Sequence, residues 1–443
     1  MARGAALTAG GVAGGKPQRA LKKAVSVRCV GGAPARWTHT PLAHAPHAPH
    51  TPRCTMATRG AAAREHLERL LRVATCLAEG GYGAQVAQLA ATARAFYSDA
   101  QVWAAQVHHR GPRGRTHLMH AALIGSTARV QYLLDRGAAV DAATVGGWTA
   151  LMLASVKGHL ETVRCLVKRG GANVNVASTT VGFTALMWAC DKGHLEIVRY
   201  LVERGGVAVN AARTTDGFTA LMGACEKGHL ETVRFLVERG GAVVNAGTTT
   251  DGATALMFAS IKGLQEIARF LVERGGAAVN AGRTTDGCTA LMFASIEGHL
   301  ETVRCLLERG GAAVNVARTT DGATALIVAS EVGHLETVRF LVEQGGAAVN
   351  AATTDDGATA LHKASVYGHL EVVRYLLVQQ GVPADAARTA AGETALMWAS
   401  VEGHFDTVRL LLQHGADKGL LNHDGESAHD LAAAHSLVQE ALA

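Results

Sequence analysis

The sequence predicts an all-α solenoid with β-hairpin loops, because one short pattern recurs at a fixed interval over most of the chain. A threonine followed by Ala-Leu opens each of eight copies, and successive copies lie 35 residues apart. These threonines are Thr149, Thr184, Thr219, Thr254, Thr289, Thr324, Thr359 and Thr394. Weaker copies begin at Thr116 and Ser427, each 33 residues from its neighbour. The sequence therefore predicts about nine full repeats followed by a truncated C-terminal one.

Each copy carries the signals for two short helices and a turn. In residues 217–251, Thr219 can cap a first helix that ends near Gly228. A second helix with an apolar stripe then runs from Leu230 to the pair Gly240-Gly241. The β-branched residues and Asp-Gly pair that follow predict a hairpin. Helices this short cannot bury their apolar stripes alone, so the repeats must stack on one another.

Residues 216–245 of this copy resemble the ankyrin repeat. The family pattern runs from Asp-Gly through Thr-Pro-Leu-His, Ala-Ala, Gly-His-Leu-Glu-Val-Val and Leu-Leu to Gly-Ala-Asp-Val-Asn. The matching residues are Asp216-Gly217, Thr219-Ala220-Leu221-Met222, Ala224-Cys225, Gly228-His229-Leu230-Glu231-Thr232-Val233, Leu236-Val237 and Gly241-Ala242-Val243-Val244-Asn245. The resemblance implies an ankyrin-type α-solenoid. It also implies a protein–protein interaction scaffold that binds its partner through the concave face and the hairpin tips.

Several positions depart from the family pattern. The family proline is alanine in the eight clear copies, and the histidine that follows is replaced by methionine in most repeats but present as His362. Most repeats also contain a second glycine after the second helix and one extra hairpin residue. The repeat that begins at Gly252 has Gly263-Leu264 where the others have Gly-His. We therefore expect the stack to be loosened at that repeat.

The chain divides into three segments in this interpretation. Residues 111–443 form the ankyrin-type repeat array, and residues 62–110 contain apolar stripes that predict a helical N-terminal cap. The alternative for residues 62–110 is a targeting adaptor that recruits a second component, for example in ubiquitin ligation or organelle targeting. Residues 1–61 are rich in Gly, Ala, Pro and Arg and predict a disordered basic leader.

The basic leader has three interpretations that the sequence leaves open. It is a disordered tail without a signal, an organelle transit peptide, or an upstream stretch that precedes a true start at Met56. We expect a cytoplasmic protein, with the chloroplast or mitochondrion as the alternative if residues 1–55 are a transit peptide.

Charge and hydropathy narrow the classes of partner. Residues 1–63 hold nine Lys and Arg and no acidic residue, so the other 380 residues hold 33 basic against 37 acidic side chains. The array is therefore mildly acidic and lacks the basic face that nucleic-acid binding requires. No stretch approaches the roughly 18 apolar residues of a membrane span. We expect a monomer that binds neither nucleic acid nor membrane.

The sequence predicts a protein that is not an enzyme and needs no cofactor or metal. No glycine-rich phosphate loop occurs between a strand and a helix. Histidines recur once per repeat in the Gly-His pairs, which favours bonding between repeats over catalysis, and serines recur at one helix position. A strict repeat offers no asymmetric pocket for a nucleophile and its base. The eight cysteines show no metal-ligand spacing and are predicted to pack in the core of a reduced protein.

One segment of the array combines aromatic and basic residues at positions that vary between repeats. Trp148, Phe183 and Phe218 follow hairpin glycines, and Trp188 lies within a first helix. Lysines end four successive first helices, at Lys157, Lys192, Lys227 and Lys262. Aromatic anchors with a charged rim are typical of interaction hot spots, so these eight residues predict a site for an acidic segment of a partner protein. The structural alternative is that the rings only cover the hairpin bases and the lysines are solvated.

Overall fold

The computed structural model describes residues 110–385 and 389–443. The predicted leader and all but the last residue of the predicted cap lie outside these residues. A short 3₁₀ turn, η1 (Pro112–Gly114), precedes the first repeat.

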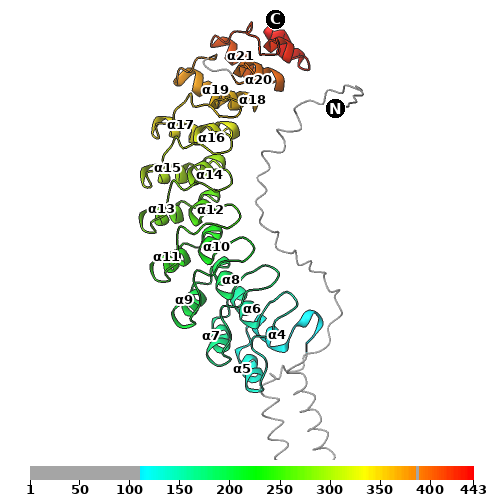
Figure 1. Ribbon diagram of the computed structural model, residues 1–443, viewed down its shortest axis with the longest axis vertical. Helices are drawn as coiled ribbons and strands as arrows, with labels where there is room; N and C mark the ends of the chain where they lie inside the picture. Colours follow the sequence, from blue (N-terminus) through cyan, green and yellow to red (C-terminus); the bar gives the residue numbers. More distant parts are fainter. Residues whose placement is uncertain (1–109, 386–388) are drawn as a thin grey trace, which may run out of the picture. The chain divides into compact units, whose positions relative to one another are not determined.

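Helices follow one another in pairs along the described chain, and Figure 1 shows the first helices in one row and the second helices in another. The first helices are α4 (His117–Leu123), α6 (Ala150–Lys157), α8 (Ala185–Asp191), α10 (Ala220–Lys227), α12 (Ala255–Ile261), α14 (Ala290–Ile296), α16 (Ala325–Val332), α18 (Ala360–Val366), α20 (Ala395–Glu402) and α22 (Ala428–Leu431). The second helices are α5 (Thr127–Asp135), α7 (Leu160–Lys168), α9 (Leu195–Arg204), α11 (Leu230–Glu238), α13 (Gln265–Glu273), α15 (Leu300–Glu308), α17 (Leu335–Glu343), α19 (Leu370–Arg374), α21 (Phe405–Gln413) and α23 (Ser436–Leu442).

The predicted α-solenoid of helix pairs is confirmed. Loops extend from the row of first helices on the side away from the second helices (Figure 1). The exposed side of the first helices together with these loops is called the first-helix face below. In the predicted hairpins, strand pairing within residues 110–385 and 389–443 is limited to isolated antiparallel bridges, such as that between Ala212 and Thr219.

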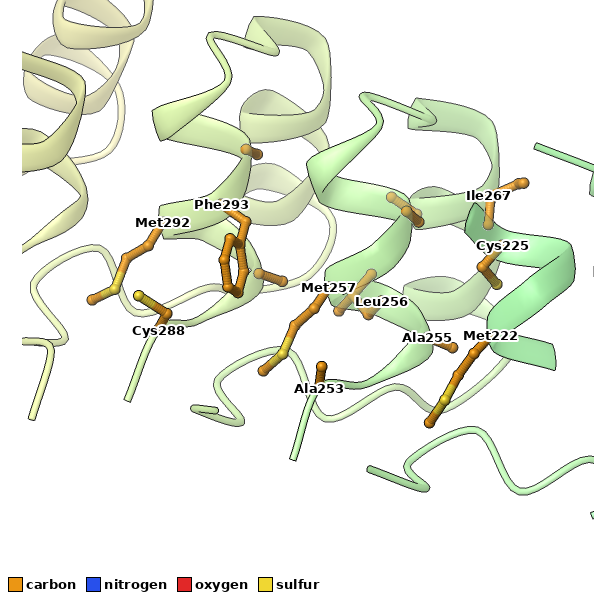
Figure 2. Close-up of a cluster of buried hydrophobic side chains, with 14 of the residues drawn as sticks. Met222, Cys225, Ala253, Ala255, Leu256, Met257, Ile267, Cys288, Met292 and Phe293 are labelled. Carbon is orange, nitrogen blue, oxygen red and sulfur yellow. The ribbon is translucent and has the colours of Figure 1, made fainter. Parts of the chain in front are cut away.

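The core consists of the same residues repeated from layer to layer. Figure 2 shows Met222, Met257 and Met292 at equivalent places on α10, α12 and α14, and all three are buried. Each first helix packs against the next first helix, and each second helix packs against the next second helix. The buried residues therefore form one continuous apolar strip instead of a globular centre.

The first helices begin at their threonines because the hydroxyl satisfies a free backbone amide. The Thr149 Oγ1 accepts from the Met152 amide at 3.3 Å, and the Thr219 Oγ1 accepts from the Met222 amide at 3.4 Å. At the other end, Gly228 adopts a φ of 81°, the left-handed conformation predicted for the end of α10. These caps confirm the boundaries expected from the sequence to within one or two residues.

Three kinds of hydrogen bond join each repeat to the next. The Asp216 carbonyl accepts from the Thr249 amide of the next hairpin at 2.8 Å. The Asn210 Oδ1 accepts from the Val243 amide at 2.8 Å. The ring of His229 reaches back to the carbonyl of Asp191 at the end of α8, at 3.1 Å. These bonds recur in most repeats, so they hold helices, turns and hairpins in one register along the array.

The first glycine after each of the six second helices α7, α9, α11, α13, α15 and α17 is required for space. A Cβ atom at these glycines would lie 2.6–2.8 Å from the carbonyl oxygen of the leucine four residues earlier. The glycines are Gly170, Gly205, Gly240, Gly275, Gly310 and Gly345. Gln380 occupies this position after α19, and there the helix ends in a π-helical turn, η2 (Tyr375–Gln379). We attribute the wider turn to the Gln380 side chain, whose Nε2 donates to the Tyr375 hydroxyl at 2.9 Å.

The repeat that begins at Gly252 lacks one of these inter-repeat bonds. Leu264 stands where other repeats have histidine, so no imidazole reaches the carbonyl of Glu226. The buried Ala268 also replaces the larger Val233 and Val303 of neighbouring repeats. Ile267, buried where most other repeats have threonine, restores part of the lost apolar volume. A lost hydrogen bond of this kind weakens an interface by about 1 kcal/mol.

We therefore predict faster amide hydrogen exchange in residues 252–286 than in residues 287–321, which have the complete set of contacts. Exchange measured by mass spectrometry on the full chain checks this. The variant Leu264→His should slow exchange in this repeat because it restores the missing donor. Equal protection of the two repeats in the unmodified protein would contradict the prediction.

Candidate functional site

Aromatic side chains from four consecutive repeats meet on the first-helix face. Trp148, Phe183 and Phe218 each stand between a hairpin glycine and the threonine that caps the next first helix. Trp188 and Phe258 lie on α8 and α12, four residues after the capping threonine. The structure thus brings together the four predicted aromatic residues and adds Phe258. These five residues are called the aromatic row.

The rings of the aromatic row touch in sequence. The Trp148 and Trp188 ring centroids are 4.8 Å apart and stacked, and those of Phe183 and Trp188 are 4.7 Å apart. The Phe183 and Phe218 centroids are 6.1 Å apart, and Phe218 meets the edge of Phe258 at 5.4 Å. Such contacts stabilise each pair by about 0.5–1.5 kcal/mol beyond area burial. The row is therefore a preorganised surface whose rings hold each other in place.

Phe258 of the row and Arg213, which contacts two of its rings, were not among the predicted site residues. Phe258 could have been found, because it occupies in its repeat the helix position that Trp188 occupies two repeats earlier. The Arg213 guanidinium lies 5.1 Å from the Phe183 ring centroid and 4.9 Å from that of Phe218, and it pairs with Asp216. No sequence signal assigned Arg213 to these rings, because the contact joins two repeats.

The indole nitrogen of Trp188 is a polar group of the aromatic row that has no hydrogen-bond partner in the described part of the chain. Its Nε1 is buried and makes no hydrogen bond within the described residues. The Trp398 Nε1, at the same helix position, donates to Glu393 Oε2 at 2.7 Å. Phe183 occupies the position of Glu393 in the Trp188 repeat, so no carboxylate is available there. Because this nitrogen is covered by its neighbours, the unpaired N–H marks a polar group that the fold does not satisfy, and it is not open to a bound chain in this conformation.

The hairpins beside the aromatic row have apolar tips. Val181 stands where the next five hairpins have aspartate, and Val145 lies at the tip of the preceding hairpin. Val145 is 82% exposed. The later hairpins are braced by ion pairs such as that between Arg283 and Asp286. The row is thus flanked by exposed aliphatic side chains at its Trp148 end and by the Arg213–Asp216 ion pair beside Phe218.

The four predicted lysines are all exposed at the ends of the first helices. Two of them are neutralised by the residue before them, since Lys192 Nζ lies 2.9 Å from Asp191 and Lys227 Nζ lies 2.9 Å from Glu226. Lys157 and Lys262 have no ion pair within residues 110–385 and 389–443. The basic rim of the site therefore rests on these two lysines.

The histidines of the Gly-His pairs connect repeats, which confirms the predicted inter-repeat bonding. Each Nε2 lies 2.9–3.2 Å from a carbonyl oxygen at the end of the preceding first helix. The histidines are His159, His194, His229, His299, His334, His369 and His404. The recurring serines, such as Ser260 and Ser295, are fully buried in the first helices. Neither set is arranged as a nucleophile beside a base.

Five cysteines fall within the described residues, and all are buried and unbridged, as predicted: Cys165, Cys190, Cys225, Cys288 and Cys305. Burial raises the pKa of the Cys190 and Cys225 thiols and raises that of Cys288 to about 11. Thiols held protonated in this way are poor nucleophiles and metal ligands. The described residues contain no group of three or more side chains that could hold a metal ion.

A second aromatic cluster lies between α18 and α20. The His362 ring meets the edge of the Trp398 indole at 5.5 Å, and Lys363 Nζ lies 5.3 Å from the Trp398 ring centroid. Lys363 also pairs with Asp356 at 3.2 Å. Burial lowers the pKa of His362 to about 4, so this ring is neutral near pH 7. Trp398 Nε1 and Lys363 are paired with carboxylates, whereas His362 Nε2 is buried without a partner among the described residues; the cluster contains one indole, while the aromatic row joins five rings.

The model of the family described as ankyrin repeats (3 copies) matches residues 87–178, 170–248, 241–318, 310–388, 345–422 and 377–441. The chain therefore belongs to the ankyrin repeat family. A search of the curated proteins finds no match. Ankyrin repeats serve in general as protein-binding scaffolds and are usually not catalytic. No helix within residues 110–385 and 389–443 has the length and apolar character needed to cross a membrane.

The buried His362 generates a prediction about pH. The Thr359 amide donates to His362 Nδ1 at 3.3 Å, which requires that nitrogen to be unprotonated. The folded pKa, about 4, lies below the ordinary 6.5, so the unfolded chain takes up a proton first as the pH falls. The neutral His362 contributes roughly 3 kcal/mol to the free energy of unfolding. This contribution is complete above about pH 6.5 and is lost as the pH falls through about 4.

The variant His362→Met removes the titrating imidazole and introduces the methionine that most repeats have at this position. We expect its free energy of unfolding, measured with denaturant, to fall less between about pH 6.5 and about pH 4 than that of the unmodified chain. The same acid loss in both proteins would show that His362 does not carry this dependence.

Proposed function

We propose that the chain is a non-enzymatic scaffold that binds a partner protein through the aromatic row. The observation that carries the proposal is the contact of Trp148, Trp188, Phe183 and Phe218 on the first-helix face, with one indole N–H left unpaired. Rigid aromatic side chains lose little conformational freedom on binding, which is why they dominate interaction hot spots.

The surroundings of the row favour an extended segment of the partner. Val145 and Val181 supply aliphatic contacts beside the rings. Lys157 and Lys262 lack ion-pair partners among the described residues and favour carboxylates at the edge of the site. An acidic segment with apolar side chains satisfies both features.

The structural alternative is that the rings serve the fold alone. Phe218 fits this alternative, because its side chain is only 7% exposed and is largely covered by the fold itself. Trp148, Phe183 and Trp188 are only partly buried, and the Trp188 indole nitrogen gains no hydrogen bond from the fold. A ring placed only to cover a hairpin base does not account for a desolvated donor without a partner.

The double variant Trp148→Ala with Phe183→Ala tests the proposal. Proteins that bind the unmodified chain are first identified by affinity capture and mass spectrometry, and the purified partner is then titrated by calorimetry. We expect the double variant to bind about 2 kcal/mol more weakly, or roughly 30-fold, because two anchors of the row are removed.

Phe293→Ala is the matched control for loss of stability. Phe293 is buried on α14 and carries an Arg283 contact at 5.2 Å, but it lies outside the aromatic row. This variant should lower the melting temperature while leaving the affinity for the partner unchanged. Undiminished binding by a folded Trp148→Ala, Phe183→Ala protein would defeat the proposal.

A further inference from the structure

The charge at the end of the first helices changes sign along the array. One equivalent position in each repeat reads, in order, Lys157, Lys192, Lys227, Lys262, Glu297, Val332, Tyr367 and Glu402. Because the helices stack in register, these residues lie along one edge of the first-helix face, and Figure 1 shows α6 to α20 in a single row. The charged residues at this position are all lysines before α14 and all glutamates from α14 onward, with the neutral Val332 and Tyr367 between the two glutamates.

The charges beside this edge weaken the basic half but leave the difference in sign between the two halves. In the first half, Asp191 and Glu226 neutralise two lysines but leave Lys157 and Lys262 without an ion-pair partner among the described residues. Glu297 and Glu402 in the second half are likewise exposed and outside any ion pair within residues 110–385 and 389–443.

Further carboxylates strengthen the acidic half. Glu331 accepts from the Tyr367 hydroxyl at 3.4 Å, and Glu393 accepts from the Trp398 indole. Burial, together with the nearby Glu331, raises the pKa of Tyr367 to about 12. These donors are neutral, so both carboxylates keep their negative charge on the face.

The second helices do not share this asymmetry. Their glutamates are followed three residues later by arginines that pair with them: Glu161–Arg164, Glu196–Arg199, Glu231–Arg234, Glu266–Arg269, Glu301–Arg304, Glu336–Arg339 and Glu371–Arg374. The separation of charge is therefore a property of the first-helix face and not of the composition of each repeat.

We propose that this edge binds one extended segment of a partner protein whose own charges are segregated, with its acidic part over α6 to α12 and its basic part over α14 to α20. The proposal rests on the proposed function and adds the direction in which the segment lies. A single segment fits because α12 and α14 pack directly against each other, so the edge continues through the change of sign. At about 8–10 Å between packed helices, an extended segment of roughly 20 residues spans the edge.

Two synthetic peptides test the proposal on the full chain. The first is a fluorescein-labelled peptide of about 24 residues with glutamates in one half, lysines in the other and Gly-Ser spacers. The second has the same composition with glutamate and lysine alternating. We expect the segregated peptide to bind at least about fivefold more tightly in fluorescence anisotropy, because only it can pair with both halves at once.

Charge reversal of each half gives the sharper test. Lys157→Glu with Lys262→Glu, and separately Glu297→Lys with Glu402→Lys, should each abolish the preference for the segregated peptide. The fourfold variant should restore it, because the peptide then binds in the opposite direction. Energy transfer from the fluorescein to an acceptor attached at the C-terminus of the chain should change accordingly between the unmodified and fourfold proteins.

Glu301→Lys with Glu336→Lys is the matched control, since it makes the same charge change on the second helices and should leave the preference intact. A fourfold variant that shows no preference, or no preference in the unmodified chain, would overturn the directional inference. Neither result touches the proposed function, which is judged by the effect of Trp148→Ala and Phe183→Ala on the natural partner.

Discussion

The interface between neighbouring repeats is the constraint on which the rest of this structure depends. A first helix of seven or eight residues cannot bury its apolar stripe against a single second helix, so α10 also packs against α8 and α12, and its Leu221 and Met222 are almost fully buried. Stability is then the sum of many similar contacts, and it can vary locally without loss of the fold. The repeat with Leu264 shows such a variation, because one polar bond is missing while the apolar strip stays continuous.

Polar bonds between repeats give these interfaces their register. Apolar packing is not directional, and it would tolerate small shifts of one helix pair against the next. The imidazole of His229, the amide of Asn210 and the hairpin amide of Thr249 each require one alignment of neighbouring repeats. The same alignment places equivalent side chains in straight lines on the first-helix face. Aromatic rings 35 residues apart in sequence, such as Phe183 and Phe218, can therefore touch.

Function in this architecture depends on the positions that the stack leaves free. The capping threonine, the Ala-Leu pair and the hairpin glycine are nearly constant because packing or backbone geometry requires them. The residue after the hairpin glycine varies from Trp148 to Ala253 to Glu393 without disturbing the helices. Aromatic character and charge can therefore vary along the face while the fold is kept. The aromatic row and the segregated charges lie at such positions.

The sequence by itself determined the fold class and the repeat boundaries, and it predicted four of the five rings of the aromatic row. A fixed period, capping threonines and paired glycines predict helix pairs directly, because these signals act within a few residues of chain. The tertiary structure decided which of these residues act together. The order of ring contacts from Trp148 to Phe258, the Arg213 guanidinium between two rings and the π-helical turn before Gln380 depend on atoms in adjacent layers or on local crowding. A pattern read within one repeat cannot fix distances between repeats, and these follow only when the layers are packed together.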